Sequence, residues 1–488
     1  MDRDTLEKAL EHISDRHISD AVKPKRRRPY WVGAVAAATA AAILILAFLF
    51  PDTPTVPGTT VPDTTTGPDI PIGSVLPDNA IRLAAAPRIM AQPNRSNYRN
   101  TQDYNAAFNA WRTQKEARTD TTAAALQALT PFFKDSASVF LSGNENTLWS
   151  PVNAYVGLAM LAELAGGESR QQILDLFGTD SIESLREQVA AVFENAYYNN
   201  GKEISALANS IWLQEGLTYK EDAMNALAYY YYASIYQGDL AGQEMGQAIA
   251  DWLNKNTGGL LEDYPPQSLS PLTAVALYST IYFQSQWQDN FPSNGATGIF
   301  HATTGDKEVS YLRDQKDRIS YYRGDSFCAV ALPLKNGSSM WFILPDEGKT
   351  PEDILTEGQY IDMLLSYNKE NSKQVKVNLT IPEFDVSGKQ DLAPGLEQLG
   401  ITDVFSPQKA NFSSVTGDVP LYVDFINQAV RVQVDGDGVS ATAYTEIGAP
   451  GSTPPSSEDP VDFILDRPFL FVITGNNIPL FSGVVNIP

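Results

Sequence analysis

Apolar residues recur at helical spacing in the first third of the chain and at strand spacing, or in continuous runs, further on. In residues 103–118 and 123–140, large apolar side chains recur three or four positions apart. This spacing predicts two helices, the second interrupted by Pro131. A third helix is predicted to begin at Ser150, an N-cap residue followed by proline, and to end at the glycine pair 166–167.

Three later segments predict strands. Both alternating sets of residues 272–287 are apolar, which is typical of a central strand covered on two faces, and residues 339–345 have the same character. Residues 468–488 predict two strands around a Gly-Asn-Asn turn. Because helices come first and strands dominate later, without regular alternation, the sequence predicts a mixed α and β domain.

An uncharged apolar run, residues 30–50, directly follows a basic cluster. Its twenty-one residues suffice to cross a bilayer as a helix, with Tyr30 and Trp31 at an interfacial belt. The positive-inside rule then places residues 1–29 in the cytoplasm as a tail and the rest of the chain outside. A cleaved signal peptide is the alternative, but prolines follow the run in place of a small-residue cleavage site. The sequence therefore predicts a retained single-pass anchor in the cell membrane.

The composition of the chain after residue 50 predicts its division into segments. Residues 51–80 are rich in Pro and Thr and predict a stalk, residues 81–122 an extension with one helix, and residues 123–488 the main domain. A net charge of −23, without a concentrated basic surface beyond the tail, argues against a nucleic-acid partner. The single cysteine, Cys328, excludes an internal disulfide, which favours a bacterial envelope over a small eukaryotic secreted domain.

Residues for common catalytic chemistry are scarce. His301 is the only histidine outside the predicted tail, and no nucleophile-elbow glycines accompany it, which argues against an envelope hydrolase. Cys328 lies in an alternating apolar pattern typical of a buried small hydrophobe. No closely spaced His and Cys predict zinc, and no Gly-rich loop predicts a phosphate cofactor. The sequence therefore predicts no catalytic residues, no metal and no cofactor.

From about residue 123 to the C-terminus, the chain resembles the serpin family. The matching stretches are NTLWSPVNAYVGLAMLAELAGGESRQQILDLFG, LANSIWLQEGLTY, IADWLNKNTGGLL, LYSTIYFQSQWQDNF, IPEFDVSGKQDLAPGLEQLGITDVFS and PFLFVITGNNIPLFSGVVNIP. The resemblance implies a monomer with the serpin fold: three β-sheets, eight to nine helices and an exposed reactive-centre loop. It implies a suicide-substrate inhibitor of serine proteases. In such inhibitors the protease cleaves the loop, and the loop then inserts as a strand in the main sheet and traps the acyl-enzyme.

The stretch DGDGVSATAYTEIGAPGSTPPSSEDP, residues 435–460, falls on that loop. Its acidic start resembles a calcium loop, but Val439 and Ser440 stand where a ligand and a glycine are required. The resemblance assigns the hinge to Gly438, Val439, Ser440, Ala441, Thr442 and Ala443. From residue 439 onward, small and mostly apolar residues alternate with polar or amphipathic ones, as a strand buried on one face requires.

The family spacing leaves two positions open for the cleaved bond. Counted forward from Gly438, the bond is Ser452–Thr453, and counted back from the final strand pair it lies near Ser457. No Arg or Lys occurs from 432 to 466, so the expected target is elastase-like or subtilisin-like rather than trypsin-like. The alternative is a noninhibitory serpin that acts as a binding or structural module on the cell surface.

The resemblance also assigns positions in the body of the domain. Trp287 matches the family's breach tryptophan, beside the top of the main sheet, and Gly436 replaces one of two acids that commonly precede the hinge. A polar cluster beneath the insertion site is expected from Ser150, Asn153, Ser279 and Asn427.

Overall fold

A computed structural model describes residues 38–49, 80–84, 93, 95, 98–116, 122–200, 203–258, 269–292, 296–366, 373–436 and 460–488. The helices in these ranges are α2 (Thr101–Glu116), α3 (Thr122–Leu141), α4 (Pro151–Leu164), α5 (Gly167–Leu176), α6 (Ile182–Ala196), α7 (Glu221–Tyr230), α8 (Gln243–Asn256), α9 (Pro351–Glu357), α10 (Gln359–Ser366) and α11 (Ala393–Gln398), with a 3-10 turn at Asp403–Phe405. Helix α3 continues through Pro131, so the predicted interruption is absent from it.

A large sheet contains eight strands of the described chain, in the order β13-β14-β1-β7-β5-β6-β2, with β4 paired beside β5. Their bounds are β1 (Ala38–Leu49), β2 (Ile81–Ala84), β4 (Tyr198–Asn199), β5 (Ile204–Gln214), β6 (Ala233–Gly238), β7 (Thr273–Ser285), β13 (Phe384–Asp391) and β14 (Tyr422–Val434). Only β5 and β6 pair in parallel among them. Strand β7 is the central strand predicted from residues 272–287, and its core-facing and opposite sides are almost wholly buried.

The second sheet contains nine strands of the described chain, in the order β15-β12-β9-β10-β11-β16-β17-β3, with β8 paired beside β9. Their bounds are β3 (Thr147–Trp149), β8 (Ala296–Ala302), β9 (Gly305–Arg323), β10 (Phe327–Pro333), β11 (Ser339–Pro345), β12 (Lys373–Pro382), β15 (Val461–Ile464), β16 (Phe469–Gly475) and β17 (Ile478–Val485). Strand β9 pairs with β8 and β12 and also with β10. The serpin resemblance implied three sheets. Because β9 joins β8 and β12 to β10, the described strands form two hydrogen-bonded sheets.

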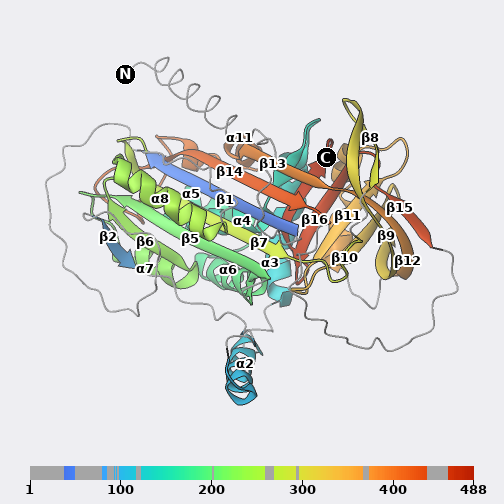
Figure 1. Ribbon diagram of the computed structural model, residues 1–488. Helices are drawn as coiled ribbons and strands as arrows, with labels where there is room; N and C mark the ends of the chain where they lie inside the picture. Colours follow the sequence, from blue (N-terminus) through green and yellow to red (C-terminus); the bar gives the residue numbers. More distant parts are fainter. Residues whose placement is uncertain are drawn as a thin grey trace.

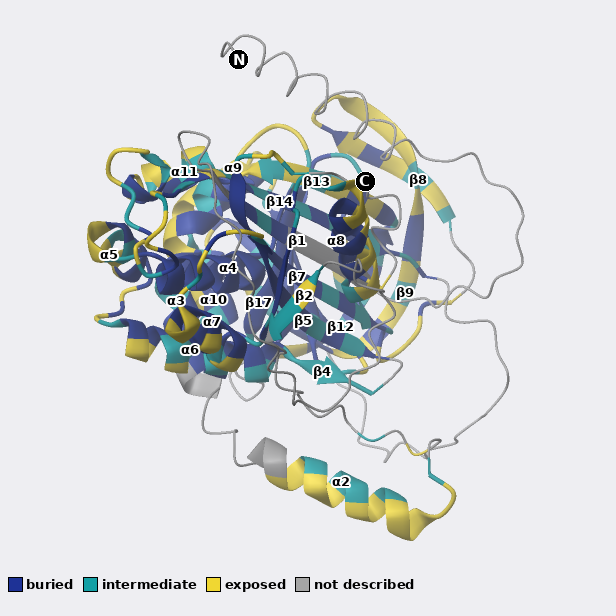
Figure 2. Ribbon diagram, turned by 90° about the vertical axis from the view of Figure 1, so that its left-hand side faces the viewer, coloured by how far each residue is buried: buried dark blue, intermediate teal, exposed yellow. Residues whose placement is uncertain are grey.

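Helices cover both faces of the large sheet. Helix α8 lies on one face, and α3, α4 and α6 lie on the other, as Figures 1 and 2 show. Every residue of α4 is buried, which agrees with the Ala, Gly and Leu content that predicted a buried helix. Helix α2 lies apart from the sheets and helices of the main domain (Figure 1).

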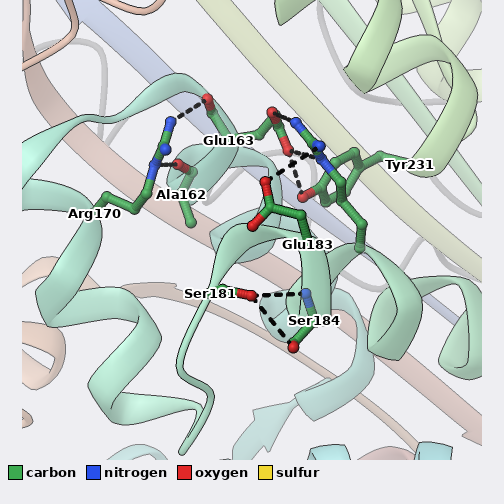
Figure 3. Close-up of polar contacts among 8 residues, drawn as sticks. Ala162, Glu163, Arg170, Ser181, Glu183, Ser184 and Tyr231 are labelled. Carbon is green, nitrogen blue, oxygen red and sulfur yellow. Dashed lines mark hydrogen bonds and ion pairs between the residues drawn. The ribbon is translucent and has the colours of Figure 1, made fainter.

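An ion pair between a buried carboxylate and a partly buried guanidinium ties α4 to α6. The carboxylate of Glu163, whose side chain is 5% exposed, accepts hydrogen bonds from Arg186 Nε at 2.9 Å and Nη2 at 2.6 Å, and from Tyr231 Oη at 3.0 Å (Figure 3). These bonds to Glu163 raise the pKa of Arg186 above its ordinary value. Burial, together with the nearby carboxylate, raises the pKa of Tyr231. The cluster therefore holds a fixed charge pair inside the helical layer.

The structure differs from the sequence prediction at the N-terminal apolar run. Residues 38–49 form β1, a strand within the large sheet, instead of part of a helix over 30–50 (Figure 1, blue). Within the described ranges, no helix has both the length and the apolar character needed to cross a bilayer. A strand buried on both faces and a membrane helix both require an uncharged run, so hydropathy alone does not separate the two structures.

Candidate insertion site in the large sheet

Strand β1 lies between β7 and β14 and is antiparallel to both. Its register with β7 runs from Ala38 opposite Ser285 to Leu49 opposite Thr273. With β14 it runs from Thr39 opposite Gln433 to Leu49 opposite Tyr422. Because β7 and β14 are each hydrogen-bonded to β1 over almost their full length, the centre of this sheet is a site that accommodates one long strand.

The described side chains of β1 alternate between the two faces of the sheet. Leu44 and Leu46 are fully buried in the main core, whereas Ile45 packs against a separate cluster that includes Trp212. Gly157 of α4 makes room for Leu44, because a Cβ at Gly157 would lie 1.9 Å from Leu44 Cδ2. The floor of the site is therefore shaped to receive an apolar side chain at this position of the strand.

A buried polar cluster lies beneath the centre of β1. Asn153 of α4 donates from Nδ2 to Ser279 Oγ of β7 at 2.8 Å and accepts at Oδ1 from Gln428 Nε2 of β14 at 3.3 Å. Gln428 also accepts from the backbone N–H of Ser150 at 2.9 Å and donates to the Ser150 carbonyl at 3.1 Å. The four residues of the cluster, Ser150, Asn153, Ser279 and Gln428, are at most 1% exposed. Because water does not reach them, their polar groups depend on the hydrogen bonds within the cluster.

The polar cluster bridges the two strands that flank β1. Leu44 pairs with Ser279 on one side and with Gln428 on the other, so these three residues form one row across the sheet. Asn153 bonds to both ends of that row from below. Helix α4 therefore contacts β7 and β14 together, with β1 between them.

The structure places Ser150, Asn153 and Ser279 in one cluster but not Asn427. Gln428 takes that place, while Asn427 pairs with Ile45 and is only partly buried. Successive residues of a strand point to opposite faces, so a shift by one residue exchanges the buried side chain for one on the other side. The sequence itself offers a signal for this position, because a second amide residue, Gln428, directly follows Asn427.

Ser150 is the N-cap residue of α4, as predicted, but its side chain bonds to another element. It is the residue before α4, but its side chain makes no capping hydrogen bond. Its Oγ donates instead to the carbonyl of Leu480 in β17, at 2.7 Å. Ser150 therefore joins the start of α4 to both sheets, because its backbone also bonds to Gln428.

Trp287 lies just beyond the end of β7 where β1 begins. Its side chain is 3% exposed, and its Nε1 donates to the carbonyl of Asp435 at 3.2 Å. Next in the chain, Gly436 donates from its backbone to Glu383 Oε1 at 3.3 Å. A Cβ at Gly436 would lie 2.2 Å from Leu312 Cδ2, so a larger residue there requires Leu312 to move. The glycine that replaces a common acid is therefore suited to the close packing at this corner.

The predicted hinge and cleavage positions are outside the described residues. These are Gly438, Val439, Ser440, Ala441, Thr442, Ala443, Ser452, Thr453 and Ser457. The structure describes the chain up to Gly436, directly after β14, and again from Pro460, before β15. The assignments within this loop stay predictions.

The residues weighed for catalysis are placed apart from this site. His301 is exposed, and its Nδ1 lies 2.8 Å from Asp306 Oδ1 in the β8–β9 hairpin. Cys328 of β10 is partly buried, and burial raises the pKa of its thiol. Across the described ranges, no group of three or more His, Cys, Asp or Glu side chains is arranged to hold a metal ion.

Comparison with known proteins agrees with this architecture. The family model described as Serpin (serine protease inhibitor) matches residues 132–488. Plasminogen activator inhibitor 1 of Bos taurus is 30% identical over 364 residues, covering 71% of this chain and 88% of that protein, and Serpin-ZX of Arabidopsis thaliana is 29% identical over 71% of this chain and 93% of its own length. The crystal structure of the thermophilic serpin tengpin in its native state superposes with a TM-score of 0.64 at 24% identity, covering 84% of this chain and all of that one.

The chain belongs to the serpin family, because the family model covers most of its length. The sheets and helices form the serpin fold, and members of this family are protease inhibitors rather than catalytic enzymes.

Proposed function

We propose that this serpin is a suicide-substrate inhibitor of an elastase-like or subtilisin-like serine protease. The serine hydroxyl of the protease attacks the carbonyl carbon of the cleaved bond, Ser452–Thr453 or one near Ser457. The peptide C–N bond breaks, the new amino group leaves with the proton, and an ester to the protease remains. Insertion of the cut loop into the large sheet then distorts the protease before water hydrolyses that ester.

The observation that carries the proposal is the site between β7 and β14. The large sheet accommodates a full-length strand there, antiparallel to both neighbours, as an inserted loop would be. The loop leaves β14 beside Trp287, at the end of the sheet where such a strand begins. The small residues at 439, 441 and 443 suit the buried face of such a strand.

The proposal includes a location at the surface of a bacterial cell. Residues 30–50 are the proposed membrane anchor when residues 38–49 are not in the large sheet, with residues 1–29 cytoplasmic, residues 51–80 as a stalk and the serpin domain outside, as a monomer. The support is the charge pattern, the length of the apolar run and the absence of paired cysteines.

One observation favours a second candidate, a noninhibitory serpin that acts as a binding or structural module on the cell surface. The central place of the large sheet already holds β1, which leaves that place closed to a cleaved loop unless β1 departs. This candidate predicts that cleavage of the loop gives only nicked protein.

The two candidates are separated by incubating the full chain with elastase-like and subtilisin-like proteases. We expect a covalent complex that survives denaturing electrophoresis, together with a rise in thermal stability after loop cleavage. Nicked protein alone with every protease, and no rise in the unfolding temperature, would exclude the inhibitory function and favour the second candidate.

A further inference from the structure

The strand at the centre of the large sheet comes from the N-terminal segment, outside the residues 132–488 that the family model matches. We propose that residues 38–49 are a built-in occupant of the insertion site, so that this segment and the cleaved reactive loop compete for one place in the sheet. The inference rests on the proposed inhibitory function. It adds a means by which the chain itself controls that function.

The geometry leaves room for one strand between β7 and β14. Neighbouring strands lie about 4.8 Å apart, so with β1 between them these two strands are about 10 Å apart. Strand β1 pairs with both along their length, and its Leu44 fits over Gly157 of α4. A second strand enters only if β1 leaves, because each side of β7 and β14 is already hydrogen-bonded within the sheet.

The two competitors share an entrance and a direction. Strand β1 begins at the Trp287 end of the sheet, where Thr39 lies opposite Gln433, and runs away from that end. The reactive loop leaves β14 after Val434 at the same end and would run in the same direction if it inserted. Occupancy by β1 therefore blocks the start of insertion as well as its final position.

The connection from β1 back to the main domain is long enough for β1 to remain attached. Strand β1 ends opposite Thr273, and β2 begins at Ile81, which pairs with Gln237 near the same end of the sheet. From β1 to β2 is four strand spacings, about 19 Å. The thirty residues 50–79 can reach several times this distance when extended, at about 3.3 Å per residue.

The proposed membrane anchor gives residues 38–49 a second possible location, the bilayer, besides the large sheet. The run 30–50 contains all of β1, and crossing a bilayer as a helix takes about 20 residues. The same residues are therefore in the sheet or in the bilayer, never in both. Entry into the membrane empties the insertion site, so a bilayer is expected to raise the yield of trapped protease.

Disulfide locking of β1 tests the inference. Ile45 and Asn427 are directly paired, so Ile45→Cys with Asn427→Cys, in a full chain carrying Cys328→Ser, brings two thiols within bonding geometry. The matched control joins Ala208→Cys to Thr280→Cys, a directly paired position of β5 and β7. Both chains are oxidised, or kept reduced, and then challenged with an elastase-like protease with and without vesicles of phosphatidylethanolamine and phosphatidylglycerol.

We expect the β1 lock to lower the yield of covalent complex about tenfold relative to its reduced form, while the loop is still cut. The control disulfide is expected to leave the yield unchanged. Vesicles are expected to raise the yield in the reduced chain and not in the locked chain. A chain with Leu44→Asp and Leu46→Asp is expected to trap at least as well as the reduced chain, because buried unpaired charges expel β1 from the sheet.

Three results would overturn the inference. The first is formation of the control disulfide without the β1 disulfide, which would show that β1 is not in the sheet. The second is an equal yield of complex from locked and reduced chains. The third is nicked product alone from every form, including Leu44→Asp with Leu46→Asp. That outcome would refute the inhibitory function and with it the competition, while the disulfide still reports the position of β1.

Discussion

Replacing Gln428 by leucine tests the buried polar cluster beneath β1. The substitution removes the acceptor for the Ser150 N–H, 2.9 Å away, and the donor to Asn153 Oδ1, 3.3 Å away. The Ser150 carbonyl loses one of two partners but keeps the hydrogen bond from Ala154 N at 3.0 Å. The main loss is therefore a buried N–H without a partner.

The expected cost follows from these contacts. A buried donor left unpaired costs about 1–3 kcal/mol, and the lost bond to Asn153 adds about 1 kcal/mol. The leucine side chain offsets about 1 kcal/mol of this through its greater apolar surface. We therefore expect a net loss of about 2 kcal/mol in the free energy of unfolding for Gln428→Leu. For a domain of this size the unfolding midpoint then falls by about 2–3 °C.

Asn427→Leu is the matched control, one residue away on the same strand. Asn427 is only partly buried and lies on the other face, so we expect a change within about 0.5 kcal/mol. Denaturant unfolding and a thermal scan of the full chain measure both variants. An equal or larger loss for Asn427→Leu would refute the assignment of Gln428 to the cluster.

Three further predictions concern other parts of the molecule. Glu163→Gln removes the buried carboxylate from the partly buried Arg186 guanidinium and is expected to lower the free energy of unfolding by about 2 kcal/mol, against less than about 0.5 kcal/mol for the exposed Glu183→Gln, both measured in denaturant. Burial raises the pKa of Tyr155 above its ordinary value of 10. Above pH 10 the folded protein therefore keeps a proton that the unfolded chain has lost, and the free energy of unfolding falls as the pH rises. Tyr155→Phe is expected to reduce that fall by about 1.4 kcal/mol per pH unit, and parallel pH profiles for the two proteins would contradict this. Val439→Asp is expected to convert an inhibitor into a substrate, because insertion would bury an unpaired charge, whereas Ser440→Asp on the outward set is expected to retain covalent trapping.

Much of the fold could be predicted from the sequence because it depends on local pattern. The Ser-Pro start and the Gly-Gly end placed α4 within one or two residues, and the doubly apolar run 272–287 predicted a central strand that is β7. Collinear family stretches then implied the serpin fold, which local pattern alone does not determine.

The parts that could not be predicted depend on contacts between distant segments. Asn427 was assigned in place of Gln428 because the two adjacent residues are both amides, and an error of one residue in the family spacing moves the assignment to the other face of the strand. The apolar run was predicted to be a helix throughout because hydropathy does not reveal that β7 and β14 offer a place for a strand. Whether residues 38–49 form a helix or a strand depends on the presence of β7 and β14 as pairing partners.

The floor of the insertion site is set by the body of the domain, whichever strand occupies it. Helix α4 contributes Asn153, which bonds to both flanking strands, and Gly157, which leaves space for an apolar side chain. Neither contact is specific for Leu44, so the choice of strand depends on which segment can reach the site. An uncut reactive loop is fixed at both ends, at Gly436 after β14 and at Pro460 before β15, whereas β1 already lies in the site. Before cleavage β1 therefore has the advantage, and cleavage frees one end of the loop to enter the site once β1 has left it.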